Sequence, residues 1–315
     1  MRCPTLAELP SPPPGKTGWP WTIESPQLPD TMPDGSLWPR ISIVTPSYNQ
    51  GQFVEETIRS VLLQGYPDIE YIVMDGGSSD ESVGIIQRYS TWMAHWQSGS
   101  DNGQVAALNS GFQKCSGDLL NWLNSDDLLH KNALINVARC FELVPNVDVI
   151  SACRTHCNKQ SEDVWTDKSS ISYWPLYRFG TADFPQDATF ISKKTLIENM
   201  PLDERFNFIF DTALYTKIMR KNPVIVFIDA SISSIRMYPE MKTLRSDEKK
   251  EGEQKILQNE YIPTSIFSKI IFRLFSTRYH ALALAVVRLL FTDYRMVFIL
   301  KFDPMTSQWL IRSAR

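Results

Sequence analysis

An apolar stretch that runs directly into two adjacent aspartates is the feature that most constrains the fold of this chain. Leu119–Leu123 has the composition of a buried strand, and Asn124–Asp127 follows it without a break. In open α/β folds, ligands bind beyond the carboxyl ends of the strands. Carboxylates at that edge suit Mg²⁺ or Mn²⁺, and such a metal commonly also holds substrate phosphates. A second interpretation is that Asp126 or Asp127 caps a helix that begins near Leu128.

Short β-branched runs alternate along the chain with segments whose apolar residues have helical spacing. Alternation with short connections predicts a three-layer α/β/α fold with a mostly parallel sheet. The expected strands are Ile41–Thr45, Ile69–Met74, Ala94–Gln97, Leu119–Leu123, Val147–Ile150 and Val224–Ile228, and the expected helices are Val54–Leu62, Ser82–Tyr89 and Val105–Gln113.

Acidic residues follow three of these expected strands. Asp75 follows the second strand, Asp101 the third, and Asp126 with Asp127 the fourth. Successive strand ends of a doubly wound sheet converge on one crevice. Three carboxylate sites around one crevice are costly unless a cation or hydrogen-bond donors neutralise them. The sequence therefore predicts one cation- or ligand-binding site at this edge of the sheet.

The two ends of the chain differ in composition from its middle. Residues 1–39 hold ten of the twenty prolines together with three tryptophans, which predicts an extended, irregular arm lying against the domain surface. Residues 264–315 contain eight Lys/Arg and two Asp/Glu, a net charge of +6. Apolar stripes with basic interruptions predict a helical, amphipathic region over 246–315. It would either contact a membrane surface or form a helix pair packed on the main domain or at a dimer contact.

The bulk composition excludes several classes of protein. A net charge of −3 over 315 residues gives no nucleic-acid signal. Five scattered cysteines argue against a disulfide framework and for a reducing compartment, and the segment Cys153–Cys157 lacks a second ligand pair for zinc. No signal peptide and no run of 18 apolar residues is present. We therefore expect a cytoplasmic protein, peripheral at the inner face of the plasma membrane if the C-terminal region binds lipid.

Four segments share their order and spacing with a known family. They are Thr45–Gln50 at the first strand, the turn Asp75–Asp80, the segment Asp101–Gly111 with the pattern D-x-G-Q-x-x-A-x-N-x-G, and Asn124–Asp127 at the place of a DxD-type metal motif. Together they resemble family 2 glycosyltransferases of the inverting, bacterial polysaccharide type, which have the GT-A (nucleotide-diphospho-sugar transferase) fold. The resemblance runs from about residue 40 to residue 243, roughly two thirds of the chain, and four ordered motifs are far more specific than any one alone.

The resemblance implies a division of the chain and a reaction. Residues 40–245 would form the catalytic domain, with a nucleotide-binding half (40–130) and an acceptor half (131–245), flanked by the arm 1–39 and the region 246–315. The implied reaction moves a sugar from a nucleotide diphosphate sugar, a UDP-sugar in the first instance, to a hydroxyl of a glycan or lipid-linked glycan. Mn²⁺ or Mg²⁺ would be the cofactor, and cell-envelope polysaccharide synthesis the setting.

The resemblance also implies roles on the donor side. Asp75 would accept a hydrogen bond from the uracil imide, although an aspartate before two glycines also stabilises a turn. Asp101 would hold the base or ribose, and Asp126 would be the principal metal ligand, with Asp127 assisting it or capping the next helix. The other implied nucleotide-site residues are Thr45, Pro46, Tyr48, Asn109, Asn124 and Ser125.

On the acceptor side, the resemblance implies that Asp211 removes the proton of the acceptor hydroxyl. The apolar residues before it would raise its pKa and make it a better base, whereas the alternative is that it caps a helix. Gln186 and Asp187 would contact the acceptor. Arg236 and Lys242 would bind the diphosphate.

Three positions depart from the family pattern. Asn124 replaces the commoner Asp, Ala213 stands where relatives often carry a second acid, and Tyr238 replaces a His. The last two favour an alternative, a catalytically degenerate nucleotide- or glycan-binding relative. A nucleotidyltransferase is the third candidate, but Thr45–Gly51 lacks the basic, glycine-rich phosphate loop that such an enzyme would need.

Overall fold

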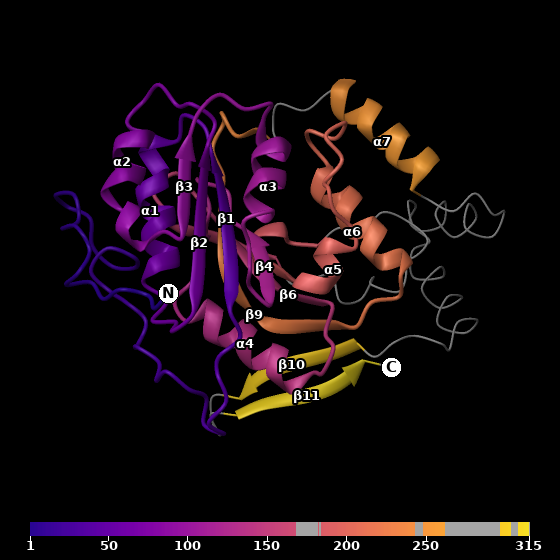
Figure 1. Ribbon diagram of the computed structural model, residues 1–315, viewed down its shortest axis with the longest axis horizontal. Helices are drawn as coiled ribbons and strands as arrows, with labels where there is room; N and C mark the ends of the chain where they lie inside the picture. Colours follow the sequence, from indigo (N-terminus) through magenta and orange to yellow (C-terminus); the bar gives the residue numbers. More distant parts are fainter. Residues whose placement is uncertain (168–181, 183, 243–247, 262–296, 304–307, 315) are drawn as a thin grey trace.

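The computed structural model describes residues 1–167, 182, 184–242, 248–261, 297–303 and 308–314, and for the last two ranges it describes the backbone. Within these residues one mixed sheet forms the centre of the molecule (Figure 1). Its order is β11-β10-β9-β6-β8-β4-β1-β2-β3, while β5 pairs with β9 and β7 with β6. The strands are β1 (Ile41–Ser47), β2 (Ile69–Asp75), β3 (His95–Ser98), β4 (Leu119–Trp122), β5 (Leu128–Leu129), β6 (Val149–Cys157), β7 (Asp163–Asp167), β8 (Thr189–Ser192), β9 (Ile225–Arg236), β10 (Val297–Asp303) and β11 (Gln308–Ala314).

The first four strands are parallel and end at the same edge. β1 lies between β2 and β4, with Ser47 opposite Asp75 at the end of the β1–β2 ladder. All seven residues of β1 are buried, as expected for a central parallel strand that is covered on both faces. The polar residues that follow these strands therefore meet at one edge.

Helices cover both faces of the sheet. α1 (Gly51–Leu62), α2 (Ser82–Arg88) and α4 (Ala133–Leu143) contribute to one core cluster, and α3 (Gln104–Phe112), α5 (Lys193–Ile197) and α6 (Phe210–Arg220) to the other. In α1, Val54, Ile58 and Val61 recur at helical spacing and are fully buried against the sheet. The predicted three-layer α/β/α fold is confirmed.

The sheet is more mixed than the sequence analysis predicts. β8 runs antiparallel to both β4 and β6. The chain enters β8 through the 3-10 helix Gln186–Ala188, whose Gln186 lines the same cavity as the residues after β4. The chain therefore begins β8 at the edge of the sheet where β4 ends, and β8 runs in the direction opposite to β4.

The helix expected near Leu128 does not begin there. Leu128–Leu129 is the short strand β5, which pairs with Ser233 and Ser234 of β9, and α4 begins at Ala133 after a left-handed Asn132 with φ 65°. The capping interpretation of Asp126 and Asp127 is therefore wrong. Pairing of β5 with β9 instead ties the acidic turn to the acceptor half.

The arm formed by residues 1–39 packs along the α1 side of the domain. Arg59 of α1 is buried beneath it and donates hydrogen bonds to the carbonyls of Pro10, Pro20 and Trp21 at 2.8–3.1 Å. Backbone bonds from the arm also reach the loop between α1 and β2. Four apolar side chains of the arm join the main core, namely Cys3, Leu9, Met32 and Trp38.

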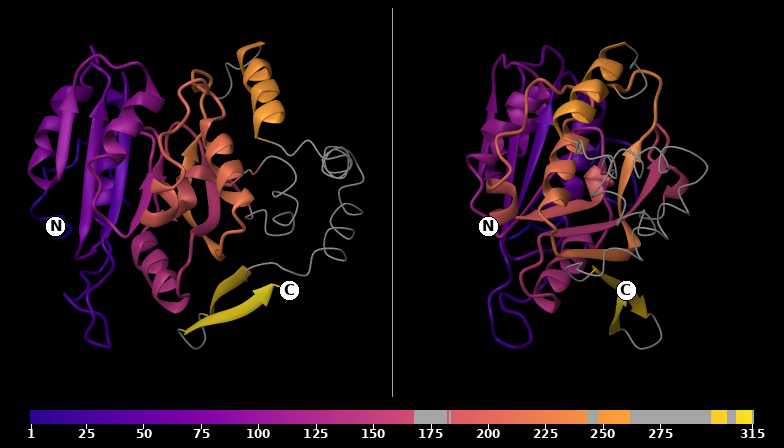
Figure 2. Two further views of the ribbon diagram at one scale, coloured as in Figure 1. Left: turned by 45° about the vertical axis from the view of Figure 1, so that its right-hand side comes forward. Right: turned by 90° about the vertical axis from the view of Figure 1, so that its right-hand side faces the viewer.

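The described residues of the C-terminal region include strands as well as a helix, which corrects the prediction of an all-helical region at 297–303 and 308–314. α7 (Glu248–Glu260) is a helix, but β10 and β11 form an antiparallel pair that extends the sheet beyond β9 (Figure 2). Val297–Ile299 is a β-branched and aromatic run that suits a strand beside the open edge of β9. The expected amphipathic segments within 262–296 lie outside the described residues. In the described part of the chain, none of the helices combines the length and the apolar character needed to cross a bilayer.

Candidate active site

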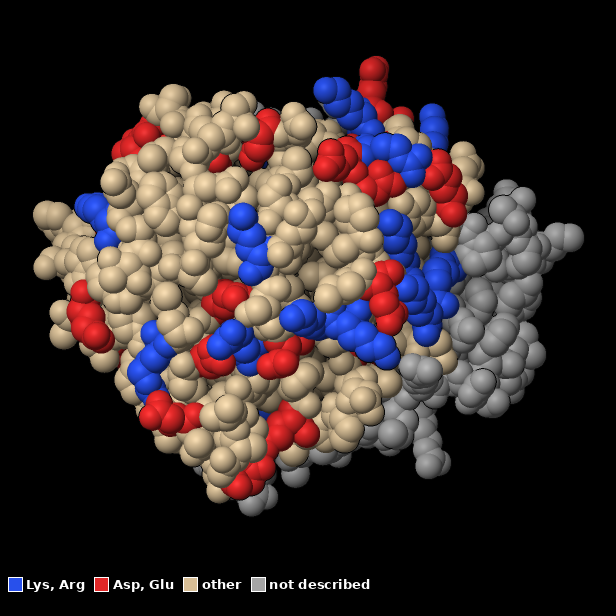
Figure 3. Space-filling view, viewed as in Figure 1, with Lys and Arg blue, Asp and Glu red and all other residues tan. Residues whose placement is uncertain are grey.

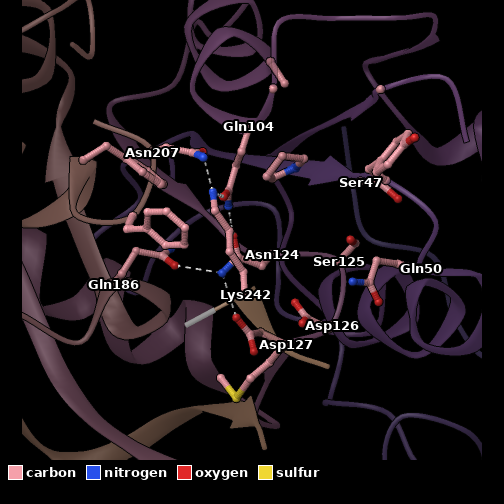
Figure 4. Close-up of a pocket in the computed structure, with 18 of the residues that line it drawn as sticks. Ser47, Gln50, Gln104, Asn124, Ser125, Asp126, Asp127, Gln186, Asn207 and Lys242 are labelled. Carbon is pink, nitrogen blue, oxygen red and sulfur yellow. Dashed lines mark hydrogen bonds between the residues drawn. The ribbon is translucent and has the colours of Figure 1, made fainter. Parts of the chain in front are cut away.

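A cavity of about 740 Å³ lies at the edge where β1, β2, β4 and β9 end. Side chains from both halves of the domain line it (Figure 4). It brings together eleven of the fifteen residues to which the sequence analysis assigns a role. They are Pro46, Tyr48, Asp101, Asn124, Ser125, Asp126, Asp127, Gln186, Asp211, Arg236 and Lys242.

The turns after β1 and β2 are fastened to each other. The Asn49 side-chain oxygen accepts from the Ser79 amide at 2.9 Å, and the Asn49 amide donates to Ser78 Oγ at 2.8 Å. The Gly51 amide donates to Asp80 Oδ2 at 2.9 Å. These bonds fix the backbone of the two turns, which contribute Tyr48, Gln50 and Gly76 to the cavity lining.

Asp75 organises the second of these turns and does not line the cavity. Only 2% of the residue is exposed. Its Oδ2 accepts from the amides of Gly77 and Ser78 and from the Ser98 hydroxyl, and its Oδ1 accepts from the Ser78 hydroxyl at 2.6 Å. In this structure the expected base-binding carboxylate is thus engaged inside its own turn, with Gly77 at a φ of 81° that glycine adopts without strain.

Asp101 reaches the cavity from the loop after β3. It approaches Gly76 so closely that a Cβ there would lie 3.1 Å from Asp101 Oδ2. Its Oδ1 accepts from the Gly103 amide at 2.8 Å. A side chain at position 76 would therefore require the Asp101 carboxylate to shift by a few tenths of an ångström, so Gly76 and Asp101 are in close contact at the cavity wall.

A chain of polar side chains crosses the cavity (Figure 4). Lys242 Nζ donates to Asn207 Oδ1 at 2.8 Å and to Gln104 Oε1 at 3.0 Å. Gln104 Nε2 donates to Asn124 Oδ1 at 2.8 Å, and Asn124 Nδ2 donates to Gln186 Oε1 at 3.2 Å. The sequence analysis gives no role to Asn207 or Gln104, although Gln104 stands inside a recognised motif. The chain links the nucleotide half to the acceptor half.

Asp126 and Asp127 lie side by side at the base of the cavity. Asp127 is buried, where its Oδ1 accepts from the Arg236 amide at 3.1 Å and its Oδ2 from Asn124 Nδ2 at 3.0 Å. Loss of hydration, followed by the charges of Asp126 and Asp187, raises the pKa of Asp127 well above its ordinary value. Loss of hydration also raises the pKa of the half-buried Asp126, against the opposing effect of a hydrogen bond from Tyr238. The pair is electrostatically unfavourable without a positive partner.

Tyr238 holds the carboxylate of Asp126. Its hydroxyl donates to Asp126 Oδ2 at 2.6 Å and accepts from Gln50 Nε2 at 3.3 Å. Its ring packs on Phe53 with centroids 5.0 Å apart. Burial and the neighbouring Asp126 carboxylate raise the pKa of Tyr238, so the phenol remains a hydrogen-bond donor at neutral pH. The position that departs from the family pattern thus orients the expected metal ligand.

The side chain of Arg236, an expected diphosphate contact, is buried at the acidic turn. Its side chain is 0% exposed, so the guanidinium is not presented as a phosphate-binding group. Nε donates to the Asp126 carbonyl at 2.9 Å, Nη1 to Ser161 Oγ at 2.7 Å, and Nη2 to Glu56 Oε2 at 3.3 Å. It reaches this buried position because β9 runs beneath the acidic turn. Arg236 therefore supports the turn Asn124–Asp127 through hydrogen bonds on the side away from the cavity opening.

Three other residues that the sequence analysis assigns to the site bond to the protein scaffold instead of facing the cavity. The Thr45 hydroxyl is buried and accepts from the Tyr71 hydroxyl at 3.1 Å. Asn109 of α3 is buried, and its Oδ1 accepts from the Leu202 amide at 2.8 Å. Asp187 is buried, bonded to Ser233 and paired with Arg154 at 3.3 Å. In this structure each of these polar groups is satisfied by the scaffold, and none of the three residues lines the cavity.

The acceptor side of the cavity is formed by the start of α6 and the loop before it. Phe208 and Phe210 supply apolar surface there, and Asp211 lines the cavity beside them. Asp211 lies in the first turn of α6 after the N-cap position, which Ile209 occupies, so it is not the cap that the alternative interpretation proposes. Its Oδ1 accepts from the Thr212 amide at 2.7 Å.

The donor set fits a hard divalent cation at Asp126 and Asp127. Carboxylate oxygens are the preferred ligands of Mg²⁺ and Mn²⁺. A cation would also offset the cost of placing the buried Asp127 beside the half-buried Asp126, since the pKa values of both carboxyls are raised. Over the described residues, no group of three or more His, Cys, Asp or Glu side chains is arranged so that it could hold a metal ion by itself. Such an ion would therefore take its remaining ligands from bound phosphate and water.

The chain matches known glycosyltransferases in sequence. Residues 42–206 match the family model described as "Glycosyl transferase family 2". An uncharacterized glycosyltransferase of Rickettsia prowazekii (strain Madrid E) is 28% identical over 197 residues, covering 59% of this chain and 60% of that protein. One of Mycobacterium tuberculosis (strain ATCC 25618 / H37Rv) is 41% identical over 90 residues, covering 28% of this chain and 34% of that protein. The chain thus spans less than two thirds of the length of these curated relatives.

Solved structures show the same fold. The mannosyltransferase PcManGT of Pyrobaculum calidifontis, in complex with GDP-Man and Mn²⁺, aligns with a TM-score of 0.54 at 16% identity, over 85% of this chain and 79% of its own. S. aureus TarS 1-349 in complex with UDP aligns with a TM-score of 0.53 at 17% identity, over 76% of this chain and 73% of its own. Fold and family match together define a glycosyltransferase with a GT-A-type α/β domain. The chain belongs to glycosyl transferase family 2, whose model covers more than half of it.

Proposed function

We propose that this protein is an inverting, metal-dependent glycosyltransferase that uses a UDP-sugar. The acceptor would be a hydroxyl of a glycan or of a lipid-linked glycan. The observation that carries the proposal is the shared cavity, in which the acidic turn of the nucleotide half and Asp211 of the acceptor half face the same space. Nucleotide-sugar complexes of the structural neighbours, with UDP-GlcNAc in one and with GDP-Man and Mn²⁺ in another, support a donor of this class.

On the donor side, the nucleotide would lie over Gly76 and Asp101, with Tyr48 at the mouth of the cavity. Asp75 keeps the turn in shape, while Asp101 offers its exposed carboxylate to the base or ribose. Asp126, oriented by Tyr238, would hold the divalent cation together with Asp127. The bound cation would supply positive charge for the diphosphate leaving group. Lys242 is a second positive group at the same cavity.

On the acceptor side, Asp211 would act as the general base. The acceptor oxygen forms a bond to the anomeric carbon as the bond from that carbon to the diphosphate breaks, and the hydroxyl proton passes to the Asp211 carboxylate. Attack from the face opposite the leaving group inverts the anomeric centre. Phe208 and Phe210 offer apolar surface to a sugar ring, and Gln186 and Asn207 offer amide groups to its hydroxyls.

The setting of the reaction is part of the same proposal. With a glycan or lipid-linked glycan as acceptor, the enzyme would act in cell-envelope polysaccharide synthesis at the inner face of the plasma membrane. The basic composition of residues 264–315 supports contact with an anionic lipid surface. Binding to vesicles that contain anionic lipid, compared with neutral vesicles, tests this point.

The test of the function is turnover of a panel of UDP-sugars with Mn²⁺, read by release of UDP and by NMR of the product's anomeric centre. We expect inversion. In the variant Asp211→Asn, turnover should fall by about 10²–10⁴-fold, the usual contribution of general-base catalysis, while the affinity for UDP is unchanged. Retention of configuration, or full activity of Asp211→Asn, would contradict the proposed mechanism. Nucleotide binding without any turnover would favour the degenerate-binder alternative.

A further inference from the structure

A buried carboxylate from α7 caps the loop that forms the acceptor side of the cavity. Glu253 is only 7% exposed, although α7 is otherwise a polar surface helix in which Leu257 is the other buried residue. Figure 3 shows Lys, Arg, Asp and Glu side chains gathered over this part of the surface. A buried carboxylate on such a helix is costly unless hydrogen-bond donors satisfy it.

Three consecutive backbone amides satisfy it. Glu253 Oε1 accepts from the Asn207 amide at 2.8 Å, and Oε2 accepts from the amides of Phe208 and Ile209 at 2.9 and 3.1 Å. Successive N–H groups that point to one anion form a backbone nest. The nest lies at the N-terminus of the 11-residue helix α6, where amides have no intrahelical partner and the helix dipole favours negative charge.

The capped loop is the one that carries the acceptor-side groups. Asn207 and Phe208 line the cavity, and Asp211 follows Ile209 by two residues. Lys242 Nζ donates to Asn207 Oδ1 and lies 5.5 Å from the centre of the Phe208 ring. The cavity lining includes these residues but not Glu253. Glu253 therefore acts on the cavity through the backbone of residues 207–209.

Other contacts dock α7 independently of Glu253. Arg205 Nη2 pairs with Glu260 and Asp203, each at 2.7 Å, and the Tyr261 hydroxyl donates to Asp203 Oδ2 at 2.8 Å. Leu257 packs in the core cluster that also contains Phe206. Loss of the Glu253 carboxylate would thus leave the helix attached and change only how the loop is held.

We propose that Glu253 is a positioning residue for glycosyl transfer, which fixes Asp211 and the acceptor side of the cavity by capping the amides of residues 207–209. The inference rests on the proposed role of Asp211 as the base. Glu253 is 42 positions from Asp211 in the sequence and belongs to a helix outside the family match, so no motif reports it.

The test compares Glu253→Ala with Glu251→Ala, a change at an exposed carboxylate on the same helix. The assay is UDP release from the UDP-sugar that the wild-type protein turns over best, with Mn²⁺. We expect kcat of Glu253→Ala to fall about 10- to 100-fold, the order of loss that a displacement of about 1 Å of a reacting group causes. The affinity for UDP should stay within about twofold, since the donor side is unchanged. Glu251→Ala should behave as wild type.

Chemical rescue separates positioning from general damage. Glu253→Ala leaves three amides that formate or acetate can reach, so either anion should restore kcat in a saturable way in this variant alone. Glu253→Gln keeps the volume and one acceptor oxygen, and should give an intermediate kcat with the fold intact. Exchange of the amide hydrogens of residues 207–209 should accelerate in Glu253→Ala and slow again with formate.

The outcomes separate the two proposals. If Glu253→Ala keeps the kcat of Glu251→Ala while Asp211→Asn is inactive, the role of Glu253 is overturned and the proposed function stands. Loss of kcat in Glu253→Ala without any rescue by formate or acetate would also overturn it. If Asp211→Asn remains active, or the wild-type protein turns over no UDP-sugar, the proposed function fails and this inference fails with it.

Discussion

Replacing Arg236 by methionine tests whether this side chain supports the acidic turn or binds phosphate. In the structure the guanidinium is fully buried, pairs with Glu56 at 3.3 Å, and donates to the Asp126 carbonyl and to Ser161. It also lies over the Phe53 ring at 4.5 Å. Methionine fills much of the same volume but donates no hydrogen bond, so Glu56 is left buried without its cation.

The magnitude follows from that geometry. Removing one partner of a buried ion pair costs about 3–5 kcal/mol, because an uncompensated charge stays behind. This is a large part of the roughly 5–15 kcal/mol by which a domain is stable. At about 2–4 °C per kcal/mol for a domain of this size, Tm should fall by about 6–20 °C. Urea unfolding followed by tryptophan fluorescence measures the free-energy change directly.

A double-mutant cycle provides the control. Glu56→Gln in the Arg236→Met background removes the stranded charge, so it should restore part of the lost stability rather than add to the loss. The contrary result would be an Arg236→Met protein with wild-type stability and a selective loss of UDP affinity. That outcome would restore the phosphate-binding role and refute the supporting role.

Two further predictions concern the acidic turn. Tyr238→Phe removes the 2.6 Å bond that orients Asp126, so Mn²⁺-dependent UDP binding should weaken about 10- to 100-fold in calorimetry. The lost hydrogen bond to a charged group, about 1.5–3 kcal/mol, should also lower Tm by about 3–12 °C in thermal melts. Undiminished affinity would contradict the orienting role. Because the folded-state pKa values of Asp126 and Asp127 are raised, their contribution to stability is complete below their unfolded pKa near 4 and is lost as the pH rises through the folded values. Thermal melts with a chelator should show this decline, Mn²⁺ should reverse it, and the double variant Asp126→Asn, Asp127→Asn should show neither effect.

The sequence predicts the site residues best where the end of a strand determines the position of the residue. Asn124–Asp127 follows an apolar strand, so its place at the carboxyl edge is dictated by the sheet, and the same holds for Pro46 near the carboxyl end of β1. Asp211 is located by the resemblance, and the structure brings it to the same cavity. The local sequence thus predicts the position of a residue well when the position of its backbone is enough to bring it to the cavity.

What the sequence did not determine is the direction of polar side chains. Asn109 and Asp187 stand in recognised motifs, but each finds a closer partner in the scaffold, Leu202 for one and Ser233 with Arg154 for the other. The burial of Arg236 depends on Glu56, which lies 180 residues away in the chain. Such pairings arise from tertiary packing, which no local pattern reports.

The strands at the C-terminal end were missed for a related reason. Val297–Asp303 is apolar except for Lys301 and Asp303, a composition that serves a strand or a helix equally well. The open edge of β9 decides between them, because the strand satisfies its backbone groups there. Glu253 was missed since α7 has little apolar periodicity, and its buried side chain is a carboxylate rather than an apolar residue.

Isothermal titration of UDP, with and without Mn²⁺, on the wild type and on Asp126→Ala tests the central claim most directly. The account predicts micromolar binding that requires both the metal and Asp126, with GDP binding more weakly. UDP binding that is equally tight without metal, or unchanged in Asp126→Ala, would contradict the assignment of the acidic turn as the metal-dependent donor site. Preference for GDP would overturn the uridine assignment, and binding of neither nucleotide to the folded protein would contradict the account of the cavity as a donor site.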